Sequence, residues 1–147
     1  HETPATAILF EITEETMIST PATILDNLLK LRAMGCGLSM DDFGAGHSSL
    51  DRLCALPFTQ LKLDATFTRR LRTQPRAALI IRGIVQLSEA LQLPLVVEGV
   101  ETLEQQAQLR DLGCTIAQGY LYARPMPADH FLGFCRTHGR QAITAAR

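Results

Sequence analysis

The sequence lacks the features that mark several classes of protein. Its 147 residues have a formal net charge of −1 at pH 7, so no overall field would attract a polyanion. No apolar run reaches the roughly 18 residues of a membrane span, and the N-terminus does not have the order of a signal peptide. No run of Lys or Arg indicates a nucleic-acid groove. We therefore expect a cytoplasmic chain with no membrane span and no DNA or RNA partner.

The cysteines lie too far apart for a zinc site. None belongs to a CxxC or Cys/His cluster, and each stands beside apolar residues, as a small core residue does. The four are Cys36, Cys54, Cys114 and Cys135. We interpret them as reduced, buried thiols.

Strand-like and helix-like segments alternate along the chain. The short apolar runs are residues 7–12, 38–42, 61–64, 95–97 and 116–122. They are too short and too apolar to be half-solvated, and no two-residue hairpin turn separates them. The pattern predicts an α/β fold in which helices cover a parallel sheet.

Repeat length favours part of a TIM (β/α)8 barrel with about five βα units. Units of about 30 residues would need about three more upstream to make a barrel of about 250 residues. The chain also opens at His1, without Met, which suggests a fragment. A complete five-stranded open sheet is the alternative. Such sheets commonly carry a Gly-rich phosphate loop after the first strand, and no GxGxxG or P-loop follows it here.

Several helices have sequence signals of their own. Thr20-Pro21 is expected to start the first, and Ile80, Ile84, Leu87 and Leu91 predict the buried face of a longer one. Thr102 with Gln105 forms a capping box. We predict a domain over residues 1–137 and a patternless tail over 138–147.

Acidic residues stand at the C-terminal ends of four predicted strands. They are Glu11, Asp41, Asp42, Asp64 and Glu98. In a barrel these ends meet around one rim, where barrel enzymes carry out their chemistry. Gathered carboxylates repel one another unless cations lie between them, and oxygen ligands favour Mg²⁺ or Mn²⁺. Two such ions about 4 Å apart suit phosphodiester hydrolysis. The alternative for any single acid is a helix cap or a solvated side chain.

Lys62 precedes Asp64 by two residues, so both point to the same side of a strand. Its ammonium suits the attacking water or a developing phosphorane charge. The alternative is a surface lysine. Asp42-Phe43-Gly44 spells the kinase DFG, but neither a catalytic HRD-type loop nor a Gly-rich loop accompanies it.

The chain also resembles a known family in five segments, in order and spacing, from about Leu9 to Phe134. They resemble the later motifs of EAL-domain cyclic di-GMP phosphodiesterases. The segments are Glu11-Ile12-Thr13-Glu14, residues 40–50 (MDDFGAGHSSL), Leu61-Lys62-Leu63-Asp64, residues 97–102 (VEGVET) and Gln118-Gly119-Tyr120-Leu121.

The resemblance implies roles for the metal-binding acids. Glu11 and Asp41 would ligate one metal ion, and Asp41, Asp42 and Glu98 would surround the second ion or its water. Lys62 would orient that water.

The resemblance also implies supporting residues and a partner. Gln118 would contact water or substrate near the metals, and Glu14 and Glu101 would hold the rim loops. Residues 43–49 resemble a loop that links the metal site to a homodimer interface, and its glycines suit movement.

Two ligands that the family implies are missing. The Glu-Ala-Leu motif of an earlier strand does not occur before Glu11, and neither does the Asn of the next strand. We expect an enzyme that hydrolyses cyclic di-GMP to pGpG in bacterial signalling, with this chain alone nearly inactive. One alternative is a degenerate EAL module that binds the nucleotide or a protein without hydrolysis. Another is a structural dimerisation fragment that pairs through open strand edges.

Overall fold

Five parallel strands form one sheet whose order follows the chain. The computed structural model describes residues 3–13, 22–45 and 50–144. The strands are β1 (Leu9–Thr13), β2 (Gly37–Phe43), β3 (Gln60–Leu63), β4 (Leu95–Val97) and β5 (Ile116–Ala117). Each pairs in parallel with the next, so β1 and β5 are open edges. This confirms the α/β class and a TIM-barrel-like arrangement that is not closed.

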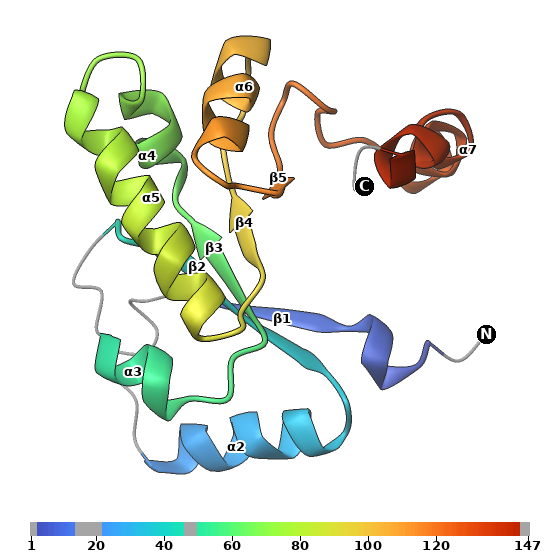
Figure 1. Ribbon diagram of the computed structural model, residues 1–147. Helices are drawn as coiled ribbons and strands as arrows, with labels where there is room; N and C mark the ends of the chain where they lie inside the picture. The colour runs from blue at the N-terminus through green and yellow to red at the C-terminus, as the bar shows by residue number, and fades with distance from the viewer. Residues whose placement is uncertain (1–2, 14–21, 46–49, 145–147) are drawn as a thin grey trace.

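Helices connect the strands, as parallel pairing requires. They are the 3₁₀ turn η1 (Ala5–Ala7), α2 (Ala22–Ala33), α3 (Leu50–Ala55), α4 (Ala65–Arg70), α5 (Pro75–Ala90), α6 (Leu103–Asp111) and α7 (Ala128–Thr144). Figure 1 shows α2 to α6 around the strands, whereas α7 (red) stands apart from them at the end of an extended connection.

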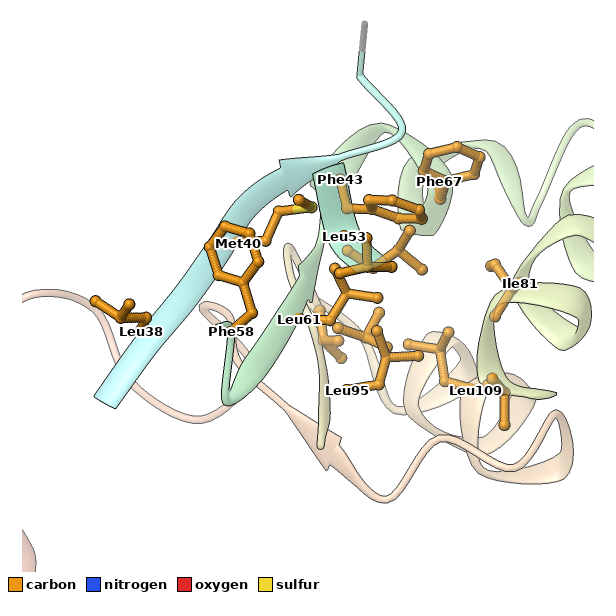
Figure 2. Close-up of a cluster of buried hydrophobic side chains, with 14 of the residues drawn as sticks. Leu38, Met40, Phe43, Leu53, Phe58, Leu61, Phe67, Ile81, Leu95 and Leu109 are labelled. Atoms are coloured by element: carbon orange, nitrogen blue, oxygen red, sulfur yellow. The ribbon is translucent and has the colours of Figure 1, made fainter. Parts of the chain in front are cut away.

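The hydrophobic core lies between the strands and helices α2 to α6. Buried side chains from all of these helices join the strand residues in one cluster. Figure 2 shows Leu61 and Leu95 of the sheet beside Ile81 of α5 and Leu109 of α6. Leu61 and Ile81 are fully buried. Burial of a Leu or Ile side chain contributes about 2 kcal/mol, so this cluster is what holds the helices on the sheet.

Alternation along the strands leaves polar residues on the other face. Leu61 and Leu63 belong to the core, so Lys62 between them points away from it. Ile12 and Met40 also pack on the core side, which turns their neighbours outward. The residues on the face opposite the core are the polar Glu11, Ser39, Asp41 and Lys62 and the apolar Val96. In a barrel this face is the interior.

Two predicted helix features differ from the structure. The buried face of α5 carries Ala77, Ile81, Val85 and Ser88, whereas Ile80 is 48% exposed. Ile84, Leu87 and Leu91 are partly buried and pack against the core as predicted, so the prediction was wrong only for Ile80. Helix α4 was not predicted, because its Thr and Arg residues show no apolar period.

The bounds of a predicted strand and of the predicted tail also differ from the structure. The run over 116–122 forms a strand only at Ile116–Ala117. The expected patternless tail from residue 138 is helical as far as Thr144, where α7 ends. The division into a domain over 1–137 and a tail over 138–147 stays a prediction. The predicted start at Thr20-Pro21 lies outside the described residues.

Caps and cysteines were predicted with mixed success. The capping box of Thr102 and Gln105 is present at the start of α6. Cys36 is buried and Cys114 is half-buried, but Cys54 and Cys135 are exposed, so the prediction of buried thiols was wrong for Cys54 and Cys135. They lie on α3 and α7, whose outer surfaces face solvent. In the described part of the chain, no helix is long and apolar enough to cross a membrane.

We predict that Gly119→Ala lowers the free energy of unfolding by about 3 kcal/mol or more. A Cβ at Gly119 would lie 2.1 Å from the carbonyl oxygen of Val100, and backbone cannot yield as a flexible side chain does. Urea denaturation measures the loss.

Gly83→Ala is the matched control for that substitution. A Cβ at Gly83 meets nothing within 4 Å, and the residue lies in the exposed middle of α5. The control should gain about 0.5–1 kcal/mol, because Ala favours helix over Gly. Equal stability of the two variants would contradict the close backbone approach at Gly119.

Candidate metal centre

One ammonium group joins acids from three strands. The Nζ atom of Lys62 lies 3.0 Å from Oε1 of Glu11, 2.9 Å from Oδ1 of Asp41 and 2.6 Å from Oε1 of Glu98. The Lys62 side chain is only 5% exposed. Three acids that the sequence placed at separate strand ends therefore meet at a single point.

The centre opens toward Glu11. The side chains of Asp41 and Glu98 are 18% and 16% exposed, whereas that of Glu11 is 48% exposed. Glu11 lies on the edge strand β1, and among the described residues no further strand pairs with the outer side of β1. Solvent therefore reaches the site at this edge.

A bulge in β2 brings two consecutive aspartates to the same place. Met40 pairs with Leu61 and Phe43 with Leu63, so β2 holds one more residue than β3 between these pairs. Asp42 has φ of 57°, a left-handed conformation that Asp tolerates better than most residues. Consecutive strand residues normally point to opposite faces. The bulge re-aims one of them, and carboxylate oxygens of Asp41, Asp42 and Glu98 lie within 4.8 Å of one another.

The charges at this centre shift the pKa values of its members. Burial lowers the pKa of Lys62, but its contacts with Glu98, Asp41 and Glu11 outweigh burial and raise it above the ordinary value. Lys62 is therefore a fixed cation at neutral pH.

Glu98 shifts in the direction that is unusual for an ion-paired acid. Burial raises the pKa of Glu98, and although Lys62 lowers it, the neighbouring charges of Asp41 and Asp42 raise it further. One ammonium cannot neutralise all the carboxylates around it, so the centre favours more positive charge.

The acidic group fits a hard divalent cation. Oδ1 of Asp41 is buried beside the ammonium of Lys62, at 2.9 Å, and within the described residues it meets no second hydrogen-bond donor. An oxygen in that position is available as a ligand, and carboxylates of this kind select Mg²⁺ or Mn²⁺ over softer metals. Glu11 lies outside the close group of three but touches the same ammonium.

The four other predicted site residues have four different outcomes. Gln118 joins the centre, because its Nε2 donates to Oε1 of Glu98 at 3.0 Å. Glu101 is exposed, and its backbone N–H donates to the side chain of Gln105, so its supporting role stays a prediction. Glu14 lies outside the described residues. Asp64 caps α4 by accepting a hydrogen bond from the N–H of Thr66, as the alternative interpretation of a single acid expected.

Sequence reasoning missed two features of the centre. It did not foresee that Lys62 itself would lie between the acids, and it did not foresee the bulge at Asp42. Two signals were available in the sequence. One was the excess of strand-end acids over the single strand lysine, Lys62, and the other was the Asp-Asp-Phe-Gly string at the end of β2. The letters Glu89-Ala90-Leu91 also occur, but they lie at the C-terminal end of α5. That end leads into the start of β4, away from the acidic centre.

The EAL domain family matches residues 1–125, which is most of the chain. The chain belongs to the EAL-domain family. The strand order, the acidic centre and the expected motifs agree with this membership.

Relatives with known names share the same region. The chain is 60% identical over 132 residues to the cyclic di-GMP phosphodiesterase RocR of Pseudomonas aeruginosa, covering 90% of this chain and 34% of RocR. It is 43% identical over 132 residues to the bifunctional diguanylate cyclase/cyclic di-GMP phosphodiesterase MucR of the same species, covering 90% of this chain and 19% of MucR. The chain thus spans about a third or less of these relatives.

Solved EAL structures match the fold. The PaMucR phosphodiesterase in complex with c-di-GMP has a TM-score of 0.80 at 43% identity, covering 87% of this chain and 52% of that one. Klebsiella pneumoniae BlrP1 with manganese and cy-diGMP has a TM-score of 0.79 at 34% identity, covering 84% and 31%.

We predict that Glu98→Gln stabilises the metal-free chain at pH 7. In the folded state the pKa of Glu98 is raised, so the folded chain holds the Glu98 proton more tightly than the unfolded chain does. The free energy of unfolding therefore falls as pH rises from the unfolded-state pKa toward the folded-state pKa. Gln removes this cost. The urea midpoint in EDTA should be higher for the variant at pH 7. The difference should vanish below about pH 4, where the acid is protonated in both states. A lower midpoint for the variant at pH 7 would contradict the assigned pKa direction.

Proposed function

We propose that this chain is part of a cyclic di-GMP phosphodiesterase that hydrolyses c-di-GMP to pGpG in bacterial second-messenger signalling. The observation that carries the proposal is the convergence of Glu11, Asp41 and Glu98 on one point, with Asp42 beside it. A cytoplasmic location is part of the proposal. The names of RocR and MucR support the substrate.

The acids would hold two Mg²⁺ or Mn²⁺ ions. Glu11 and Asp41 would ligate one, and Asp41, Asp42 and Glu98 would surround the other. When bound, such ions activate water and stabilise the leaving oxygen of a phosphodiester. The BlrP1 structures with manganese or calcium and cy-diGMP support divalent metal use.

The chain's own residues would orient the reactants. The hydrogen bond from Gln118 to Oε1 of Glu98 would help to orient that carboxylate. Lys62 stays protonated and would hold the attacking water and balance charge on the phosphoryl oxygens. Glu14 and Glu101 would support the rim loops.

We predict metal-dependent turnover by a protein that includes the complete domain. Such a protein should convert c-di-GMP to pGpG with Mn²⁺, and Glu98→Gln in it should lower turnover by at least about 100-fold because a metal ligand and its charge are lost. Gly83→Ala should retain turnover. Chromatography of the nucleotides measures both.

The isolated 147-residue chain is a second arm of that experiment. We propose that it is nearly inactive, since its sheet is open and the two further ligands of the family do not occur on it. Turnover by the chain at the rate of the complete domain would contradict this. Binding of c-di-GMP by the complete domain without turnover would favour the degenerate binding module instead.

We also propose that the chain associates with a second copy. Among the described residues the outer edges of β1 and β5 pair with no further strand, and Leu9 and Phe10 on β1 are 42% and 40% exposed. Exposed apolar edge strands pair readily with other chains. Light scattering should give a mass above 16.2 kDa. A monodisperse monomer at that mass would contradict association.

A further inference from the structure

Helix α4 packs against two places beside the acidic centre, one next to Asp41 and Asp42 and the other next to Glu98. A Cβ at Gly44, which follows the Asp41-Asp42-Phe43 strand end, would lie 2.6 Å from the ring of Phe67 on α4. A Cβ at Gly99, next to Glu98, would lie 2.5 Å from the Cβ of Ala65, where α4 begins. These glycines let a single short helix approach the ends of β2 and β4 closely.

Thr68 of α4 contacts the backbone of Glu98 directly. Its hydroxyl donates to the carbonyl oxygen of Glu98 at 2.6 Å, and the Thr68 side chain is fully buried. The Oε1 atom of Glu98 faces Lys62 and Gln118. Glu98 is therefore held at two places, at its carboxylate by the centre and at its backbone by Thr68.

The hydroxyl takes the place of a missing strand partner. In a parallel pair of strands, the N–H of one residue donates to a carbonyl of the adjacent strand. The C=O of that residue accepts from the N–H two positions further along the same adjacent strand. The N–H of Glu98 bonds the carbonyl of Leu63, so the regular donor to its C=O would be the N–H of Ala65. Ala65 has already turned into α4, where its N–H helps to lower the pKa of Asp64. Thr68 supplies the donor that the ladder has lost.

The hydrogen bond of Thr68 differs from the one that a buried hydroxyl in a helix usually makes. Such hydroxyls bond a carbonyl of the preceding turn, as Ser88 does to Val85 at 2.8 Å within α5. Thr68 instead reaches a residue 30 positions along the chain, on another strand. Local satisfaction of the hydroxyl therefore does not account for its direction.

We propose that Thr68 is a positioning residue that fixes the backbone of Glu98, and through it the carboxylate, for divalent metal binding. The metal in this proposal rests on the proposed function, whereas the position of Glu98 does not. Groups that orient metal ligands in this way typically account for about 10-fold to 100-fold in metal affinity.

The test compares four forms of the chain. They are the wild type, Thr68→Val, Thr68→Ser and the control Ser88→Ala, which removes another buried hydroxyl bond away from the centre. Mn²⁺ affinity is measured by calorimetric titration, and metal-free order at the amide of Glu98 by hydrogen exchange. Urea midpoints show how much of any change is general stability.

The expected result separates position from stability. Thr68→Val should weaken Mn²⁺ binding by about 10-fold and speed exchange at Glu98, Thr68→Ser should restore both, and Ser88→Ala should change neither. Wild-type Mn²⁺ affinity in Thr68→Val, or an equal loss in Ser88→Ala, would overturn the proposal.

Failure of the proposed function gives a different result. If the wild type binds no Mn²⁺, the metal site is refuted for this chain, and hydrogen exchange decides the role of Thr68. Faster exchange at Glu98 in Thr68→Val alone would support positioning, and unchanged exchange would overturn it.

Discussion

The ion pairs of Lys62 are the interaction on which the site depends. The ammonium lies within 3.0 Å of carboxylates from β1, β2 and the end of β4, on the sheet face opposite the core. Without a cation these acids would repel one another in a partly buried place. Burial raises the pKa of Glu98, and Lys62 offsets this and the repulsion from Asp41 and Asp42 only in part. The same imbalance that destabilises the metal-free chain is a reason for divalent ions to bind.

The fold supplies this geometry through two departures from regular structure. The bulge in β2 adds the carboxylate of Asp42 to a group that strict alternation would have split. The early turn of β3 into α4 leaves the carbonyl of Glu98 without its ladder partner, and Thr68 replaces it. Bulges and interrupted strand ends are common beside active sites, because they re-aim side chains at little cost elsewhere.

Sequence reasoning predicted what regular periodicity determines. The parallel order of the strands and the placement of Glu11, Asp41 and Glu98 at one rim followed from short apolar runs that end in acids. Helix α4 and the bulge were missed because both are irregular: α4 has no apolar stripe, and a bulge leaves no mark in a two-residue period. On α5 the prediction was wrong for Ile80 and did not include Ala77, because it followed the largest apolar side chains, whereas the small Ala77 is the one that is buried.

The central claim is that these carboxylates bind divalent cations at one shared point. The most direct test is a crystal of the chain grown with Mn²⁺ and measured at the manganese absorption edge. We expect an anomalous peak at coordination distance from oxygens of Asp41, Asp42 or Glu98. A peak elsewhere, or no peak at saturating Mn²⁺, would contradict it.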